Sequence, residues 1–245
     1  MPKIFNSFQL KLIAITIMLI DHTGAVIFPD IIFFRIVGRI AFPLFAFFIV
    51  EGFRHTSSLG RYLTRLAVCA VLFQLPDWIT ESDYMLEIFK SWGWHSVPDI
   101  EYVLNIFATL FLGLLAVTLF EKFKKINIVF SWLAAAGIAV IAEVIGADYG
   151  IYGVFYIVMF YLAGEGINKI AAGAVILHIA YVFYKMADFF ISAGSFPNLI
   201  QLYSLFAIGL IALYNREQGR KMKYFFYLFY PVHMIILYII DWMLI

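Results

Sequence analysis

Nine apolar stretches follow one another along this chain of 245 residues, and they constrain its fold more than any other feature. Most of them reach or approach the length of about 20 residues that an α-helix needs to cross the hydrocarbon core of a bilayer. Because backbone groups in lipid must be hydrogen-bonded within the protein, such stretches are expected to be helices. The sequence therefore predicts an all-α, polytopic transmembrane helix bundle with about nine spans, at residues 10–28, 32–50, 61–79, 102–120, 126–146, 150–163, 170–190, 199–214 and 224–244.

The overall composition supports membrane residence. Hydrophobic residues make up 64% of the chain and charged residues 13%, against roughly 45–50% and about 25% in a soluble domain. The longest segment between the stretches, residues 80–100, contains Trp92, Trp94 and His95, and its aromatic residues predict an interfacial position. Since no soluble domain fits between the stretches, we expect one integral membrane domain over residues 1–245.

The distribution of lysine and arginine predicts the orientation of the chain. If the N-terminus is cytoplasmic, most of the 17 Lys and Arg residues fall on the cytoplasmic side and the opposite loops are mainly acidic. The positive-inside rule then favours a cytoplasmic N-terminus and an outer C-terminus. The formal net charge is only +1 and the chain has no basic block, so no nucleic acid partner is expected.

Four ionisable residues lie inside the first two apolar stretches: Asp21, His22, Arg35 and Arg39. A charge at the bilayer centre costs about 2.5–3.5 kcal/mol on insertion scales, whereas each large apolar residue contributes only about 0.3–0.6 kcal/mol in favour of insertion. Over residues 31–50 these terms roughly cancel, which leaves the helix marginal in lipid on its own. Ionisable groups retained at this cost usually line a protein interior or a water-filled path. We therefore expect a polar site within the membrane.

The spacing of these residues predicts how they meet. Arg35 and Arg39 share a helix face, and counting 1.5 Å per residue puts Arg39 and His22 at a similar depth. The adjacent side chains of Asp21 and His22 diverge by roughly 100°. Asp21 therefore needs a partner from another helix, for which either arginine is suited, while His22 faces a reactant. Burial and nearby arginines favour the neutral imidazole that a general base requires.

Simpler interpretations exist for each of these residues. Asp21 and an arginine could form a purely structural ion pair, and His22 could be a hydrogen-bonded core histidine. Pro43, four residues after Arg39, predicts a kink in the second span. The kink either splays the helix toward the cytoplasm or is a plain kink of the kind common in membrane helices. His233 follows Pro231 in the last stretch, where a core role and a site role fit equally. The histidines lack the spacing of a zinc site, so no metal is expected.

Several segments of the chain resemble the TraX family. The longest are residues 10–24, which include LKLIAI and MLIDHTG, residues 35–47, RIVGRIAFPLFAF, and residues 51–56, EGFRHT. The resemblance extends over nearly the whole chain through shorter blocks at 61–66, 105–110, 148–153 and 223–233.

The resemblance implies a membrane acetyltransferase. Founding members of the family acetylate the N-terminal amine of conjugative pilin, and related membrane acyltransferases move acyl groups from cytoplasmic acyl-CoA to acceptors outside. It thus implies acetyl-CoA as donor, an extracytoplasmic protein or glycan as acceptor, and a multi-pass location in the bacterial cytoplasmic membrane. In this interpretation His22 acts as general base or transient acyl carrier. Asp21 organises Arg35 and Arg39, and Arg39 stabilises the oxyanion or the thioester carbonyl.

Basic residues near the cytoplasmic side are candidates for binding acyl-CoA. The side chains of Arg54, Arg61 and Arg65 match the geometry of phosphate groups, although the positive-inside rule explains them equally well. Polar residues toward the outer side are candidates for binding the acceptor. These are Asn105, Asp148 and Tyr149.

Two other functions fit the same residues. The first is a proton-coupled small-molecule transporter, in which Asp21, His22, Glu143 and His178 form a relay. Inverted repeats would favour a transporter, and we find none in the sequence. The second is a structural or assembly partner, in which the buried charges serve only helix packing.

Overall fold

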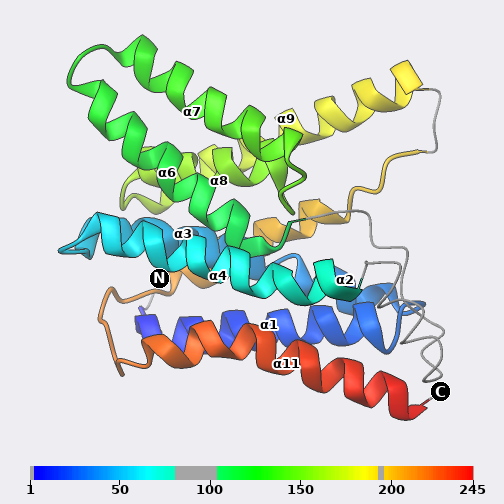
Figure 1. The fold of residues 1–245 in the computed structure, drawn as a ribbon. Coiled ribbons are helices and arrows are strands. Elements are labelled where there is room, and N and C mark those ends of the chain that lie inside the picture. Colours follow the sequence, from blue (N-terminus) through cyan, green and yellow to red (C-terminus); the bar gives the residue numbers. More distant parts are fainter. Residues whose placement is uncertain (1–2, 81–103, 193–195, 245) are drawn as a thin grey trace. The chain divides into compact units, whose positions relative to one another are not determined.

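The computed structural model describes residues 3–80, 104–192 and 196–244 (Figure 1). Most of these residues are helical, and apart from two isolated bridges they contain no β-structure. The predicted all-α class is therefore confirmed. The helices are α1 (Ser7–Val26), α2 (Ile32–Gly38), α3 (Ala41–His55), α4 (Leu59–Thr80), α6 (Ile106–Lys124), α7 (Ile128–Val144), α8 (Gly150–Ala163), α9 (Ile167–Ser192), the 3-10 helix η1 (Ile200–Phe206), α10 (Ala207–Ala212) and α11 (Lys223–Leu244).

In the described part of the chain, each apolar stretch coincides with one helix or with two consecutive helices. The predicted interfacial residues Trp92, Trp94 and His95 lie outside the described residues. Three apolar helices are shorter than a full span, so the count of nine spans and the cytoplasmic N-terminus stay predictions. Five helical segments among the described residues are long and apolar enough to cross a membrane: Ser7–Val26, Ile32–His55, Ile106–Lys124, Ile167–Ile191 and Tyr224–Leu244.

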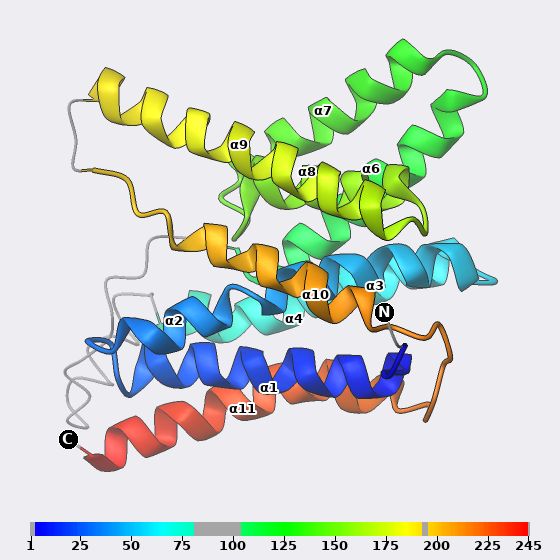
Figure 2. The same cartoon turned by 180° about the vertical axis from the view of Figure 1, so that it is seen from behind.

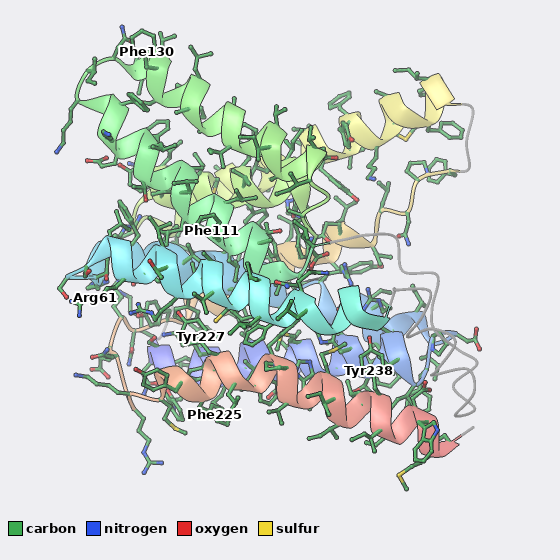
Figure 3. All side chains as sticks on the ribbon, viewed as in Figure 1. Arg61, Phe111, Phe130, Phe225, Tyr227 and Tyr238 are labelled. Atoms are coloured by element: carbon green, nitrogen blue, oxygen red, sulfur yellow. The ribbon has the colours of Figure 1, made fainter. Side chains whose placement is uncertain are left out.

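Large apolar side chains are exposed on the outside of the apolar helices, both the five longer ones and the shorter ones such as α7. Phe130 on α7 is 52% exposed and Phe225 on α11 is 40% exposed (Figure 3). In water such extensive apolar exposure would mark an interaction surface. On apolar helices of these lengths it is the surface that lipid covers, and the chain is a membrane protein.

The second apolar stretch is broken into two helices, which differs from the single kinked helix that the sequence predicts. Helix α2 ends at Gly38 and α3 begins at Ala41. Pro43 is the physical reason, because proline has no N–H and its ring clashes with the carbonyl group four residues earlier, at Arg39. The interruption therefore falls at Arg39 and Ile40, and Pro43 lies in the first turn of α3, where proline is tolerated.

The chain divides into two compact units, Met1–Phe48 with Met159–Ile245 and Ile49–Val158. In the first unit, α1 packs against α2 and α11, while η1 packs against α2, α9 and α10. Helices α1 and α11 lie side by side and run in the same direction (Figures 1 and 2). Phe8 contacts Phe226 near their starts, with ring centroids 6.2 Å apart. The single domain expected from the sequence stays a prediction.

In the second unit, α6 packs against α4 and α7. Asn105 caps the N-terminus of α6 by accepting a hydrogen bond from the backbone N–H of Phe107 at 3.0 Å. Its Nδ2 donates to the carbonyl of Ala70 at 2.8 Å and to Oε1 of Gln74 at 3.0 Å. The same side chain therefore caps the start of α6 and links α6 to α4.

Candidate functional site

The carboxylate of Asp21 on α1 binds two guanidinium groups. Nη1 of Arg35 lies 2.8 Å from Oδ2, and Nη2 of Arg39 lies 3.1 Å from Oδ1 and 3.3 Å from Oδ2. Nη1 of Arg35 also donates to the backbone carbonyl of Asp21 at 3.3 Å. Both carboxylate oxygens therefore accept from arginine, and the structure brings together the residues whose pairing the sequence predicts.

Two glycines allow α1 and α2 to approach closely enough for these ion pairs. A Cβ atom on Gly38 would overlap the side chain of Asp21, and one on Gly24 would overlap that of Phe34. Because glycine has no side chain, α1 and α2 can pack closely at these two positions. Neither glycine is among the site residues expected from the sequence, although both lie within four residues of a buried charge.

Helix α2 places both arginines at its C-terminal end. Arg35 lies in the last turn, and Arg39 follows the last residue of the helix. Nε of Arg39 donates to the carbonyl of Arg35 at 3.2 Å, which satisfies an acceptor at the end of the helix. Positive charge at a helix C-terminus interacts favourably with the helix dipole. The break caused by Pro43 therefore places the charge of Arg39 where it interacts favourably with the dipole of α2.

The ring of His22 contacts α11 through one of its two nitrogens, and the expectation that His22 faces a reactant stays a prediction. Nδ1 of His22 lies 2.6 Å from Nε2 of His233, and Nδ1 of His233 lies 2.7 Å from the carbonyl of Phe229. Because adjacent residues on α1 point in different directions, Asp21 meets α2 while His22 meets α11.

The two imidazole rings meet edge to edge. Their planes differ by only 9°. The centroids are 4.9 Å apart and the two bonded nitrogens 2.6 Å apart, and the difference is about twice the distance from a ring centroid to its own nitrogen. Both nitrogens therefore lie on the line between the centroids. The rings are thus coplanar, and a lone pair of one nitrogen points at the N–H of the other. The ring of Tyr230 lies nearly perpendicular to both, with its centroid 6.0 Å from that of His22 and 5.7 Å from that of His233.

The site has more positive than negative charge. Asp21 supplies one carboxylate against the guanidinium groups of Arg35 and Arg39, and both arginines lie within electrostatic range of His22. The side chain of Arg39 is 14% exposed, that of Asp21 13% and that of Arg35 31%. An excess charge this sheltered from solvent favours a bound or developing anion.

The three arginines suggested for acyl-CoA all belong to the second unit. Arg54 pairs with Glu51 at 3.1 Å, and Arg61 is exposed at the start of α4 (Figure 3). Nε of Arg65 is buried and has no hydrogen-bond partner among the described residues, while the guanidinium carbon lies 5.6 Å from the ring centroid of Tyr62. Of the three, Arg65 therefore has a buried donor that an anion would satisfy.

The residues suggested for the acceptor also lie in the second unit, where contacts within the fold engage them. Asn105 makes the capping and interhelical hydrogen bonds described above. The backbone N–H of Asp148 donates to the carbonyl of Leu104 at 2.9 Å, and that of Tyr149 lies 3.4 Å from Oγ1 of Thr109. The carboxylate of Asp148 lies on the surface. A role in binding the acceptor stays a prediction for all three.

The other members of the suggested proton relay, Glu143 and His178, bond to groups outside the relay. Oε2 of Glu143 accepts from the backbone N–H of Ile151 at 2.9 Å. The buried ring of His178 contacts the carbonyl of Ala174 and Oγ of Ser204, each at 2.7 Å. Across residues 3–80, 104–192 and 196–244, no group of three potential metal ligands comes together.

Comparison with known proteins shows related chains. A family model described as TraX protein matches residues 7–241. A probable fimbrial assembly protein, FimC of serogroup H1, from Dichelobacter nodosus is 30% identical over 95% of this chain and 94% of its own length. An uncharacterized protein of Rickettsia prowazekii, RP591, is 36% identical over 27% of this chain and 25% of its own length. No solved structure matches.

Proposed function

The chain belongs to the TraX family, and on that premise we propose that it is a membrane acyltransferase. The donor would be acetyl-CoA from the cytoplasm, and the acceptor an amine or hydroxyl group at the outer face. The relative named as a fimbrial assembly protein makes a pilus subunit the first acceptor to test. The N-terminal amine of pilin is the group that founding members of the family acetylate.

One observation carries this proposal: an imidazole lies beside two guanidinium groups that share a single carboxylate. Acyl transfer needs a base for the acceptor proton and a positive group for the oxyanion of the tetrahedral intermediate. His22 supplies the base, and Arg39 supplies the positive group. Asp21 holds both arginines through the bonds at 2.8 and 3.1 Å, and the remaining positive charge favours the negative intermediate over the neutral substrates.

The proposed chemistry is a single acyl transfer. The acceptor nitrogen or oxygen forms a bond to the acetyl carbonyl carbon while His22 takes the proton of the acceptor. The oxyanion then collapses, the carbon–sulfur bond breaks, and the thiolate of CoA receives the proton. The products are the acetylated acceptor and CoA with a free thiol. In a water-poor site the charge of Arg39 acts strongly on the oxyanion, because the surroundings screen it weakly.

Binding of the donor would use Arg65. Its Nε is a buried donor without a partner among the described residues, and leaving such a group unsatisfied is unfavourable. A phosphate of CoA would accept that hydrogen bond. Arg61 is exposed and would add long-range attraction for the same phosphates.

The experiment is transfer of radiolabelled acetyl groups from acetyl-CoA to isolated pilin by membranes that contain the protein. His22→Ala should lower the rate by about 10²–10⁴-fold, the usual contribution of a general base. His55→Ala is the matched control, because His55 is exposed at the end of α3. A His22→Ala protein that inserts normally and transfers acetyl at the wild-type rate would refute the proposal.

A further inference from the structure

His22 and His233 form a hydrogen-bonded chain that ends on a backbone carbonyl. The carbonyl oxygen of Phe229 can only accept, so Nδ1 of His233, 2.7 Å away, must carry a hydrogen. In a neutral imidazole the other nitrogen is then an acceptor. Nε2 of His233 therefore presents a lone pair to Nδ1 of His22 at 2.6 Å.

This order of donors and acceptors determines which nitrogen of His22 carries its proton. For the bond between the rings to form, Nδ1 of His22 must donate, which leaves Nε2 of His22 without a hydrogen. The coplanar arrangement of the rings points the N–H of His22 directly at the lone pair of His233. The rings of Phe229 and Tyr230, with centroids 5.0 and 5.7 Å from that of His233, pack against the pair and restrict its rotation.

We infer that His233 is a positioning residue that holds His22 in the tautomer with Nδ1 protonated, so that Nε2 of His22 is the atom that takes the acceptor proton. The catalytic part of this inference rests on the proposed acyl transfer; the tautomer itself does not. When Nε2 gains the proton of the acceptor, the Nδ1–H bond to His233 becomes charge-assisted and strengthens. His233 thus stabilises the imidazolium while both ring protons of His22 stay in place.

The tautomer can be measured without any assay of activity. The full-length protein is labelled with ¹⁵N-histidine in lipid vesicles, and the nitrogen chemical shifts of His22 are assigned by their loss in His22→Ala. The expected wild-type spectrum has a protonated Nδ1 and an unprotonated Nε2. In His233→Phe, which keeps a ring but removes the acceptor, His22 should shift toward the tautomer with Nε2 protonated.

Two further variants complete the test. His233→Gln restores an acceptor near the position of Nε2, and it should return His22 to the wild-type tautomer. His178→Gln is the matched control, because His178 has the same bond from Nδ1 to a backbone carbonyl but lies on α9. It should leave the spectrum of His22 unchanged.

Measurements of kcat and KM distinguish a positioning role of His233 from a loss of folding in the variants. His233→Phe should lower kcat by about 10²–10⁴-fold, as for loss of a correctly protonated base, with KM for acetyl-CoA unchanged, and His233→Gln should recover most of kcat. A wild-type His22 protonated on Nε2, or a His233→Phe protein with unchanged spectrum and kcat, would overturn the inference. If the wild type transfers no acetyl group, the proposed function fails while the spectra still decide the tautomer.

Discussion

Replacing Gly38 by alanine tests the geometry of the site with one methyl group and no change of charge. In an unobstructed helix, glycine to alanine stabilises by roughly 0.5–1 kcal/mol. At Gly38 the new Cβ would overlap the Cβ, Cγ and Oδ1 atoms of Asp21. Forcing a methyl group into a well-packed contact costs about 1–3 kcal/mol. Because Gly38 is the last residue of α2, the gain in propensity is small, and we expect a net loss of about 1–2 kcal/mol.

The assay is equilibrium unfolding of the detergent-solubilised protein, with acetyl transfer measured on the same preparations. Gly137→Ala on α7 is the matched control, since a Cβ there meets no atom within 4 Å. The control should be neutral or more stable by up to about 1 kcal/mol. Gly38→Ala should lose activity as well, because the carboxylate must move away from Arg39. If Gly38→Ala is stabilised as much as the control and keeps full activity, the close approach of α1 and α2 is wrong.

Three further predictions address individual contacts. Asp21→Asn should lower the free energy of unfolding by about 3 kcal/mol, because it leaves buried guanidinium groups without a counter-charge; adding Arg39→Gln should recover part of the loss in a double-mutant cycle, and full additivity would contradict the ion pair. Asn105→Ala should destabilise by about 1–2 kcal/mol through loss of the cap with KM for the acceptor unchanged, whereas a raised KM would show a binding role. Arg65→Gln should raise KM for acetyl-CoA at unchanged kcat, and an unchanged KM would exclude it from donor binding.

Hydropathy and helix geometry allowed much of the fold to be predicted from the sequence. The apolar stretches coincide with helices because lipid leaves the backbone no other solution. The pairing of Asp21 with Arg35 and Arg39 followed from the same physics, since a charge in an apolar stretch needs a partner at its own depth. The kink expected from Pro43 is a break between two helices in the structure. Proline affects the carbonyl four residues before it, so the signal at Pro43 already pointed to Arg39.

The contact between His22 and His233 was missed for a physical reason. Neutral histidines carry no insertion penalty large enough to demand a partner, so no energetic argument linked the first and last helices. The order of helices along a chain also does not show which of them pack together. Depth did contain a signal: His22 lies about twelve residues into its apolar stretch and His233 about nine into the last one, which at 1.5 Å per residue separates them by only about 5 Å in depth.

The balance of charge separates a reactive site from a purely structural one. A packing device would gain most from equal numbers of opposite charges, because any excess raises the desolvation penalty. Here Arg35 and Arg39 share one carboxylate, and Arg39 is 14% exposed. Both oxygens of Asp21 accept from these arginines, so the carboxylate is poorly placed to carry protons as a transporter would require. An anion that forms during a reaction, next to a base with one free nitrogen, neutralises the excess without a permanent partner. Acyl transfer through a tetrahedral oxyanion produces such a charge.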